Sequence, residues 1–112
     1  MIPKSLLRSV IQSSNKAANP KKIIQIVAEF YDLREKQLLA PSRKKEIVRP
    51  RQVAMFLLRE ELKSSYPSIG DRFGGKDHTT AIYACEKIAT ELSISDTLGD
   101  ELNLIKQRIY SE

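Results

Sequence analysis

A pair of glycines followed by short polar side chains, in the segment GGKDHTT at residues 74–80, constrains the fold of this chain more than any other feature. The two glycines predict a tight turn, because glycine adopts backbone conformations that strain other residues. Asp77 predicts a helix start, because its carboxylate can accept hydrogen bonds from the free N–H groups of a first helical turn. Behind it, apolar residues recur at spacings of three and four, which predicts one buried helix face. The members of this stripe are Ala81, Ile82, Cys85, Ile88, Ala89 and Leu92. The helix should therefore be anchored along one side and present an exposed polar tip.

Helical periodicity extends over most of the 112 residues, and no segment shows the alternation of a half-buried strand. Helices are expected at residues 5–11, 20–31, 32–40, 50–64, 68–73 and 77–92, with a last one after residue 95. Pro20 and Pro50 are each expected in the first turn of a helix, where a missing N–H costs nothing. The prediction is an all-α domain, a compact bundle of about six helices, over residues 20–112. Residues 1–19 should form an N-terminal helical connector.

Charge is unevenly distributed along the chain. The formal net charge is +5, and basic residues gather in one short segment: Arg43, Lys44, Lys45, Arg49 and Arg51. We expect residues 41–48 to form an exposed basic loop that binds an anionic partner, although a merely solvated loop has the same composition. No apolar run reaches the roughly 20 residues of a membrane helix, so no membrane association is expected. With a single cysteine and no signal-peptide pattern, the expected location is the cytoplasm.

A short helix, a glycine turn and a longer helix with a polar tip together predict a helix-turn-helix. A purely structural capping turn is the alternative, because it would use the same glycines and the same N-cap aspartate. An enzyme is not expected: Asp77 and His78 are sequence neighbours and point about 100° apart on a helix. Cys85 lies on the predicted buried stripe, which favours a core residue over a nucleophile. One histidine and one cysteine without ligand spacing predict no metal site, and no phosphate-binding loop predicts ATP binding.

Three segments in this order and spacing carry a family resemblance. They are Arg49-Pro50-Arg51-Gln52, Ile69-Gly70 and Phe73-Gly74-Gly75-Lys76-Asp77-His78-Thr79-Thr80. The chain resembles the C-terminal DNA-binding domain of DnaA, the bacterial chromosomal replication initiator, over roughly residues 21–92. The resemblance implies recognition of a short asymmetric duplex, the DnaA box, by a monomer in the bacterial cytoplasm, associated with the nucleoid.

The resemblance also implies roles for individual residues. Asp77, His78 and Thr79 fall on the base-reading positions of the family. A carboxylate can accept from cytosine N4, and a threonine methyl can pack on a thymine methyl.

Phosphate contacts are implied for Thr80, Arg51, Gln52 and Pro67, supported by Lys76 and Arg59. Arg51 and Gln52 are also expected at a helix start, where backbone N–H groups favour phosphate. Arg43 matches the arginine that enters the adjacent minor groove, which is narrow and negative in A·T-rich DNA.

This chain departs from the family pattern at several points. Lys76 stands where arginine is frequent, Tyr66 where leucine is frequent, and Tyr83 where histidine is frequent; Tyr83 is a further candidate contact. The ATPase module that precedes this domain in the family has no room in 112 residues, so no cofactor is expected in this chain and ATP only in that module. The sequence leaves open whether this is an excised domain or a free-standing protein.

Two other functions remain open at this stage. A stand-alone helix-turn-helix regulator would share the chemistry and differ in its target. A helical protein-interaction module could use the basic face for an acidic partner. Salt dependence separates the last from DNA binding, since binding to phosphates weakens steeply as salt rises.

Overall fold

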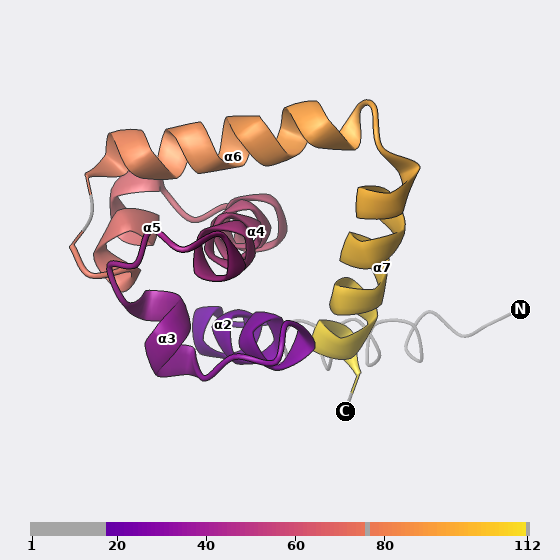
Figure 1. Ribbon diagram of the computed structural model, residues 1–112, viewed down its shortest axis with the longest axis horizontal. Coiled ribbons are helices and arrows are strands. Elements are labelled where there is room, and N and C mark those ends of the chain that lie inside the picture. The colour runs from indigo at the N-terminus through magenta and orange to yellow at the C-terminus, as the bar shows by residue number, and fades with distance from the viewer. Residues whose placement is uncertain (1–17, 76, 112) are drawn as a thin grey trace, which may run out of the picture.

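The computed structural model describes residues 18–75 and 77–111, and this part of the chain forms six helices and no strand (Figure 1). The helices are α2 (Pro20–Phe30), α3 (Glu35–Leu39), α4 (Lys45–Leu62), α5 (Tyr66–Arg72), α6 (His78–Leu92) and α7 (Asp96–Tyr110). The predicted all-α bundle is therefore confirmed. The helix expected at residues 5–11, most of the expected connector at residues 1–19 and the Lys76 site lie outside the described residues.

Helix α4 is the centre of the bundle. In Figure 1 it is seen nearly end-on, with α6 above it, α2 below it and α5 beside it. Every residue from 50 to 58 is buried, so this stretch of α4 is covered on all sides. A helix buried all round carries apolar residues on every face, which explains the continuous run of Val53, Ala54, Met55, Phe56, Leu57 and Leu58.

The helix starts follow local capping chemistry. Asn19 Oδ1 accepts from the backbone N–H of Lys22 at 2.8 Å, with Pro20 as the first helical residue, as predicted. Ser95 Oγ accepts from the N–H of Leu98 at 3.1 Å and caps α7 in the same way. These two caps fix where the first and last described helices begin.

The predicted start of the central helix is wrong. Helix α4 begins at Lys45 and runs through Pro50, so residues 45–48 are helical and only a short connection remains between α3 and α4. Proline inside a helix costs a hydrogen bond, here to the carbonyl of Glu46. Ile47 and Pro50 are both buried, and this packing stabilises the extra turns. The expectation of an exposed loop at residues 41–48 is therefore also wrong, since residues 45–48 are helical and Ile47 is buried.

Helix α7 closes one end of the bundle and packs on α2 and α6 (Figure 1). Apolar residues at spacings of three and four along this helix are buried: Leu98, Leu102, Ile105 and Ile109. Two tyrosine hydroxyls connect it to other helices, since Tyr31 donates to Glu101 and Tyr110 donates to Glu61. None of the described helices is both long and apolar enough to cross a membrane.

Candidate nucleic-acid interface

The glycine turn has the predicted geometry. Gly74 and Gly75 have φ angles of 86° and 72°, in the left-handed region that favours glycine. Before the turn, Ile69 and Phe73 are fully buried and hold α5 against the core. The turn joins α5 to α6, and these two helices pack on each other. The predicted helix-turn-helix is therefore confirmed as a structural unit.

The start of α6 is an exposed polar tip, defined by residues 77–80. Asp77 Oδ1 accepts from the N–H of Thr79 at 3.2 Å, so the predicted N-cap is confirmed. His78 Nδ1 lies 3.5 Å from the same carboxylate oxygen, and the side chains of His78, Thr79 and Thr80 are exposed. The tip thus presents a carboxylate, an imidazole, two hydroxyls and two methyl groups to solvent. Such groups can pair with the donors, acceptors and methyls of base edges.

Packing on the other side of α6 holds this tip in place. Ala81, Cys85 and Ile88 are buried as predicted, and Ala84 is buried with them. Ile82 and Leu92, expected on the same stripe, are only half-buried, and Ala89 is exposed at an open pocket beside Phe56 and Arg59 of α4. The buried face is therefore narrower than predicted, and it lies under the first three turns behind the tip.

The corner between α4 and α5 positions two further candidates, Arg59 and Pro67. Arg59 donates from Nη1 to the carbonyl of Ser64 at 3.0 Å, and its guanidinium carbon lies 4.1 Å from the centre of the Tyr66 ring. This cation–π contact gives a structural explanation for the tyrosine where the family often has leucine. Pro67 is exposed in the first turn of α5. Arg59 therefore braces the corner that presents Pro67.

Arg51 and Gln52 differ from their expected placement. They do not begin a helix; both are buried in the interior of α4, and the Arg51 residue is only 8% exposed. Arg51 donates from Nη1 to the carbonyl of Ala40 and from Nη2 to that of Ser42, each at 2.6 Å. Burial lowers the pKa of this guanidinium below its ordinary value. Arg51 thus fastens the α3–α4 connection, and the predicted phosphate contacts of Arg51 and Gln52 stay predictions.

A basic groove runs between the first turns of α4 and the exposed face of α6. Its volume is about 500 Å³. We define it by its lining residues, which are Arg43, Lys45, Val48, Arg49, Gln52, Tyr83, Lys87 and Glu91. Gln52 is covered by the helices around it but reaches this groove. The groove therefore joins two candidate DNA-contact residues, Arg43 and Gln52, to the face of α6 that continues from the polar tip.

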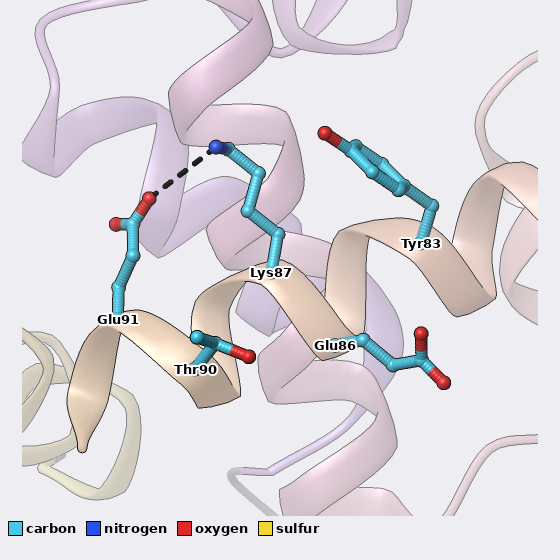
Figure 2. A pocket seen from close by; sticks show the side chains of 5 residues that line it. All are labelled: Tyr83, Glu86, Lys87, Thr90 and Glu91. Carbon is cyan, nitrogen blue, oxygen red and sulfur yellow. Dashed lines mark ion pairs between the residues drawn. The ribbon is translucent and has the colours of Figure 1, made fainter.

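Tyr83 and Lys87 extend the polar face of α6 behind its tip. The Tyr83 residue is 60% exposed, and Figure 2 shows it on the same side of the helix as Lys87 and Glu91. Lys87 Nζ lies 3.5 Å from Glu91 Oε2, and Glu91 also pairs with Arg49 of α4. The sequence analysis placed Lys45 in the basic segment, but it missed Lys87 as a candidate. A signal existed for Lys87, because Thr79, Tyr83 and Lys87 recur at intervals of four, the spacing of one helix face.

Cys85 has the environment of a core residue, as predicted. It is buried, its Sγ donates to the carbonyl of Met55 at 3.6 Å, and burial raises the pKa of its thiol to about 11. Such a thiol is a poor nucleophile at neutral pH. No group of three or more His, Cys, Asp or Glu side chains in the described part of the chain could hold a metal ion.

Comparisons with known proteins point to one family. Residues 20–88, more than half of the chain, match the family described as "Bacterial dnaA protein helix-turn-helix". The chain is 51% identical over 87 residues to the chromosomal replication initiator protein DnaA of Chloroflexus aggregans, covering 78% of this chain and 18% of that protein. It is 36% identical over 108 residues to the protein of the same name from Burkholderia multivorans, covering 96% of this chain and 21% of that protein.

A solved structure shows the same fold. It is described as the crystal structure of a DNA replication initiation factor, and it superposes with a TM-score of 0.72 at 24% identity, covering 96% of this chain and 32% of that one. The chain thus corresponds to about a fifth of the length of the two DnaA relatives named above. Because the family match covers more than half of the chain and the helix-turn-helix is confirmed, this chain belongs to the bacterial DnaA helix-turn-helix family.

Proposed function

We propose that this domain binds double-stranded DNA in a sequence-specific manner, at DnaA boxes of a bacterial replication origin, and that one monomer occupies each site. The observation that carries the proposal is the exposed tip of α6 at residues 77–80, fixed by a buried face and next to a basic groove. The names of the relatives support the biological setting, since they are chromosomal replication initiator proteins.

The arrangement divides the work between base reading and backbone binding. The tip of α6 enters the major groove, where the Asp77 carboxylate accepts from cytosine N4 and the Thr79 methyl packs on thymine. His78 reads a neighbouring base edge. Phosphates are bound by Thr80 at the start of α6, where a helix N-terminus attracts anions, and by the exposed chain at Pro67. Arg43, exposed at the mouth of the basic groove, enters the flanking minor groove.

The proposed DNA binding requires no catalysis by the domain. The carboxylate and imidazole of the tip serve as hydrogen-bonding groups, and the buried thiol of Cys85 takes no part. ATP belongs to the module that precedes this domain in the family, and any ATP-dependent step belongs to that module.

The test compares a duplex carrying a DnaA box with a scrambled duplex of the same composition. Asp77→Asn keeps the helix cap, because asparagine caps as well as aspartate, but it replaces the acceptor carboxylate with an amide. We expect Asp77→Asn to cost about 1–3 kcal/mol on the box and almost nothing on the scrambled duplex. Thr79→Val keeps the methyl group and loses the hydroxyl, so it should retain more box affinity than Thr79→Ser, which loses the methyl group.

One outcome of these measurements would contradict the proposed function. If Asp77→Asn weakens both duplexes equally, the tip does not read bases and the proposed function is wrong. Circular dichroism of each variant controls for folding. Ionic strength separates this function from an acidic protein partner, because log K for DNA falls linearly with log salt, by about 0.9 for each phosphate contacted.

A further inference from the structure

The basic groove contains a single carboxylate among several cations. Of its lining residues, Arg43, Lys45, Arg49 and Lys87 are basic, and Glu91 alone is acidic. Glu91 uses both oxygens: Oε1 pairs with Arg49 Nη1 of α4, and Oε2 lies 3.5 Å from Lys87 Nζ of α6. One carboxylate therefore occupies half of the cations that line the groove.

Glu91 is held in its charged form. Burial opposes ionisation, but the hydrogen bond from Arg49 and the charges of Arg49 and Lys87 outweigh it, so the pKa of Glu91 lies below its ordinary value. Its side chain is 28% exposed. The two ion pairs therefore persist at neutral pH, and they lie where an approaching polyanion can compete for them.

If α6 enters a major groove tip first, the basic groove lies just beyond the phosphate rim of the DNA. The major groove is about 8.5 Å deep, and a helix rises about 1.5 Å per residue, so a helix entering tip first meets the phosphate rim after about six residues. Lys87 follows the tip residue His78 by nine positions on α6, about 13 Å along the axis. A lysine side chain leans toward the helix N-terminus, which brings its ammonium group back toward that rim. Its ion pair with Glu91 draws it in the opposite direction (Figure 2).

We propose that Glu91 limits the affinity of this domain for DNA of any sequence, by competing with DNA phosphates for Arg49 and Lys87. This inference rests on the proposed function, because it assumes that α6 meets DNA with its tip. With two groove cations occupied internally, backbone binding alone is weak, and retention on DNA depends on the contacts that the tip makes with bases.

The test is Glu91→Gln, which keeps the shape of the side chain and removes its charge. We expect binding to the scrambled duplex and to the DnaA-box duplex to become about three- to tenfold tighter, as expected for releasing two exposed ion pairs. The salt slope should steepen by about 1 to 2, since each released cation that meets a phosphate contributes about 0.9.

Two sets of variants control this result. Glu86→Gln removes the same charge from the same helix, but Glu86 points to another side of α6 (Figure 2) and forms no ion pair within the described residues. It should leave the salt slope unchanged. Adding Arg49→Gln or Lys87→Gln to Glu91→Gln should remove part of the gain in DNA affinity. With Glu91 intact, each of these two substitutions alone should lower the affinity by a smaller factor. Glu91→Ala is a second variant at the same site and should shift affinity in the same direction.

The possible outcomes are distinguishable. Unchanged or weaker binding by folded Glu91→Gln and Glu91→Ala would overturn the inference, as would an equal gain from Glu86→Gln, which would reflect net charge alone. If the unaltered domain shows no preference for the box, the proposed function fails instead. If it prefers the box but Glu91→Gln changes nothing, only the role of Glu91 is wrong.

Discussion

Removing the Arg51 guanidinium should destabilise this domain more than removing any exposed arginine. Arg51 joins the central helix to the connection before it through two hydrogen bonds, to the carbonyls of Ala40 and Ser42. A hydrogen bond from a charged donor contributes roughly 1.5–3 kcal/mol. Ala40 and Ser42 are half-exposed, so water replaces part of what is lost. We expect Arg51→Met, which keeps most of the buried stem, to cost about 2–4 kcal/mol in free energy of unfolding.

The measurement is urea unfolding followed by circular dichroism. Arg43→Met is the matched control, because Arg43 is exposed in the same connection, and its cost should stay below about 0.5 kcal/mol. Arg51→Lys should recover little, since an ammonium lacks the planar fork that reaches two carbonyls. A cost for Arg51→Met no larger than that of the control would refute the bracing role. The salt slope of DNA binding then tests the separate prediction of a phosphate contact, whose loss should lower the slope by about 0.9.

Two further predictions concern the minor groove and pH. Arg43→Ala should abolish a preference for A·T-rich over G·C-rich flanks of the box, because guanidinium suits a narrow, negative minor groove; loss of the preference in Lys44→Ala but not in Arg43→Ala would refute this assignment. Tyr110 donates to Glu61 at 2.6 Å, and burial together with Glu61 raises the pKa of its hydroxyl to about 12. In the unfolded chain the tyrosine pKa is near 10. The contribution of the protonated Tyr110 hydroxyl to the free energy of unfolding is therefore complete below about pH 10 and is lost as the pH rises toward 12. Unfolding of Tyr110→Phe across this range should show a smaller loss, and an identical pH profile would contradict the coupling.

Features set by neighbouring residues were predictable from the sequence. The caps at Asn19 and Asp77 each depend on a side chain and an N–H two or three residues later. The glycine turn depends on backbone freedom at two positions. The burial of Ile69 and Phe73 depends on helical spacing within one short segment. In each case the chemistry is local, so the pattern is sufficient.

Features set by packing between distant segments were not predictable. Pro50 is typical of a first helical turn, yet burial of Ile47 and Pro50 against other helices extends α4 by more than a turn before it. The partners of Arg51 lie nine and eleven residues earlier, across a connection whose path the sequence does not define. The ion pair between Arg49 and Glu91 joins two helices and leaves no periodic signal.

The early start of α4 also changes how the basic segment can bind. As a loop, its cations would have to be ordered when DNA binds, at a cost in side-chain and backbone entropy. As a helix, Lys45 and Arg49 are four residues apart and share one face, and both line the groove before any ligand arrives. Arg51, from the interior of the same helix, holds the carbonyls that lead to Arg43. The burial of α4, which the sequence did not predict, therefore preorganises the basic groove, so substitutions at buried residues such as Ile47 should change how tightly DNA is bound.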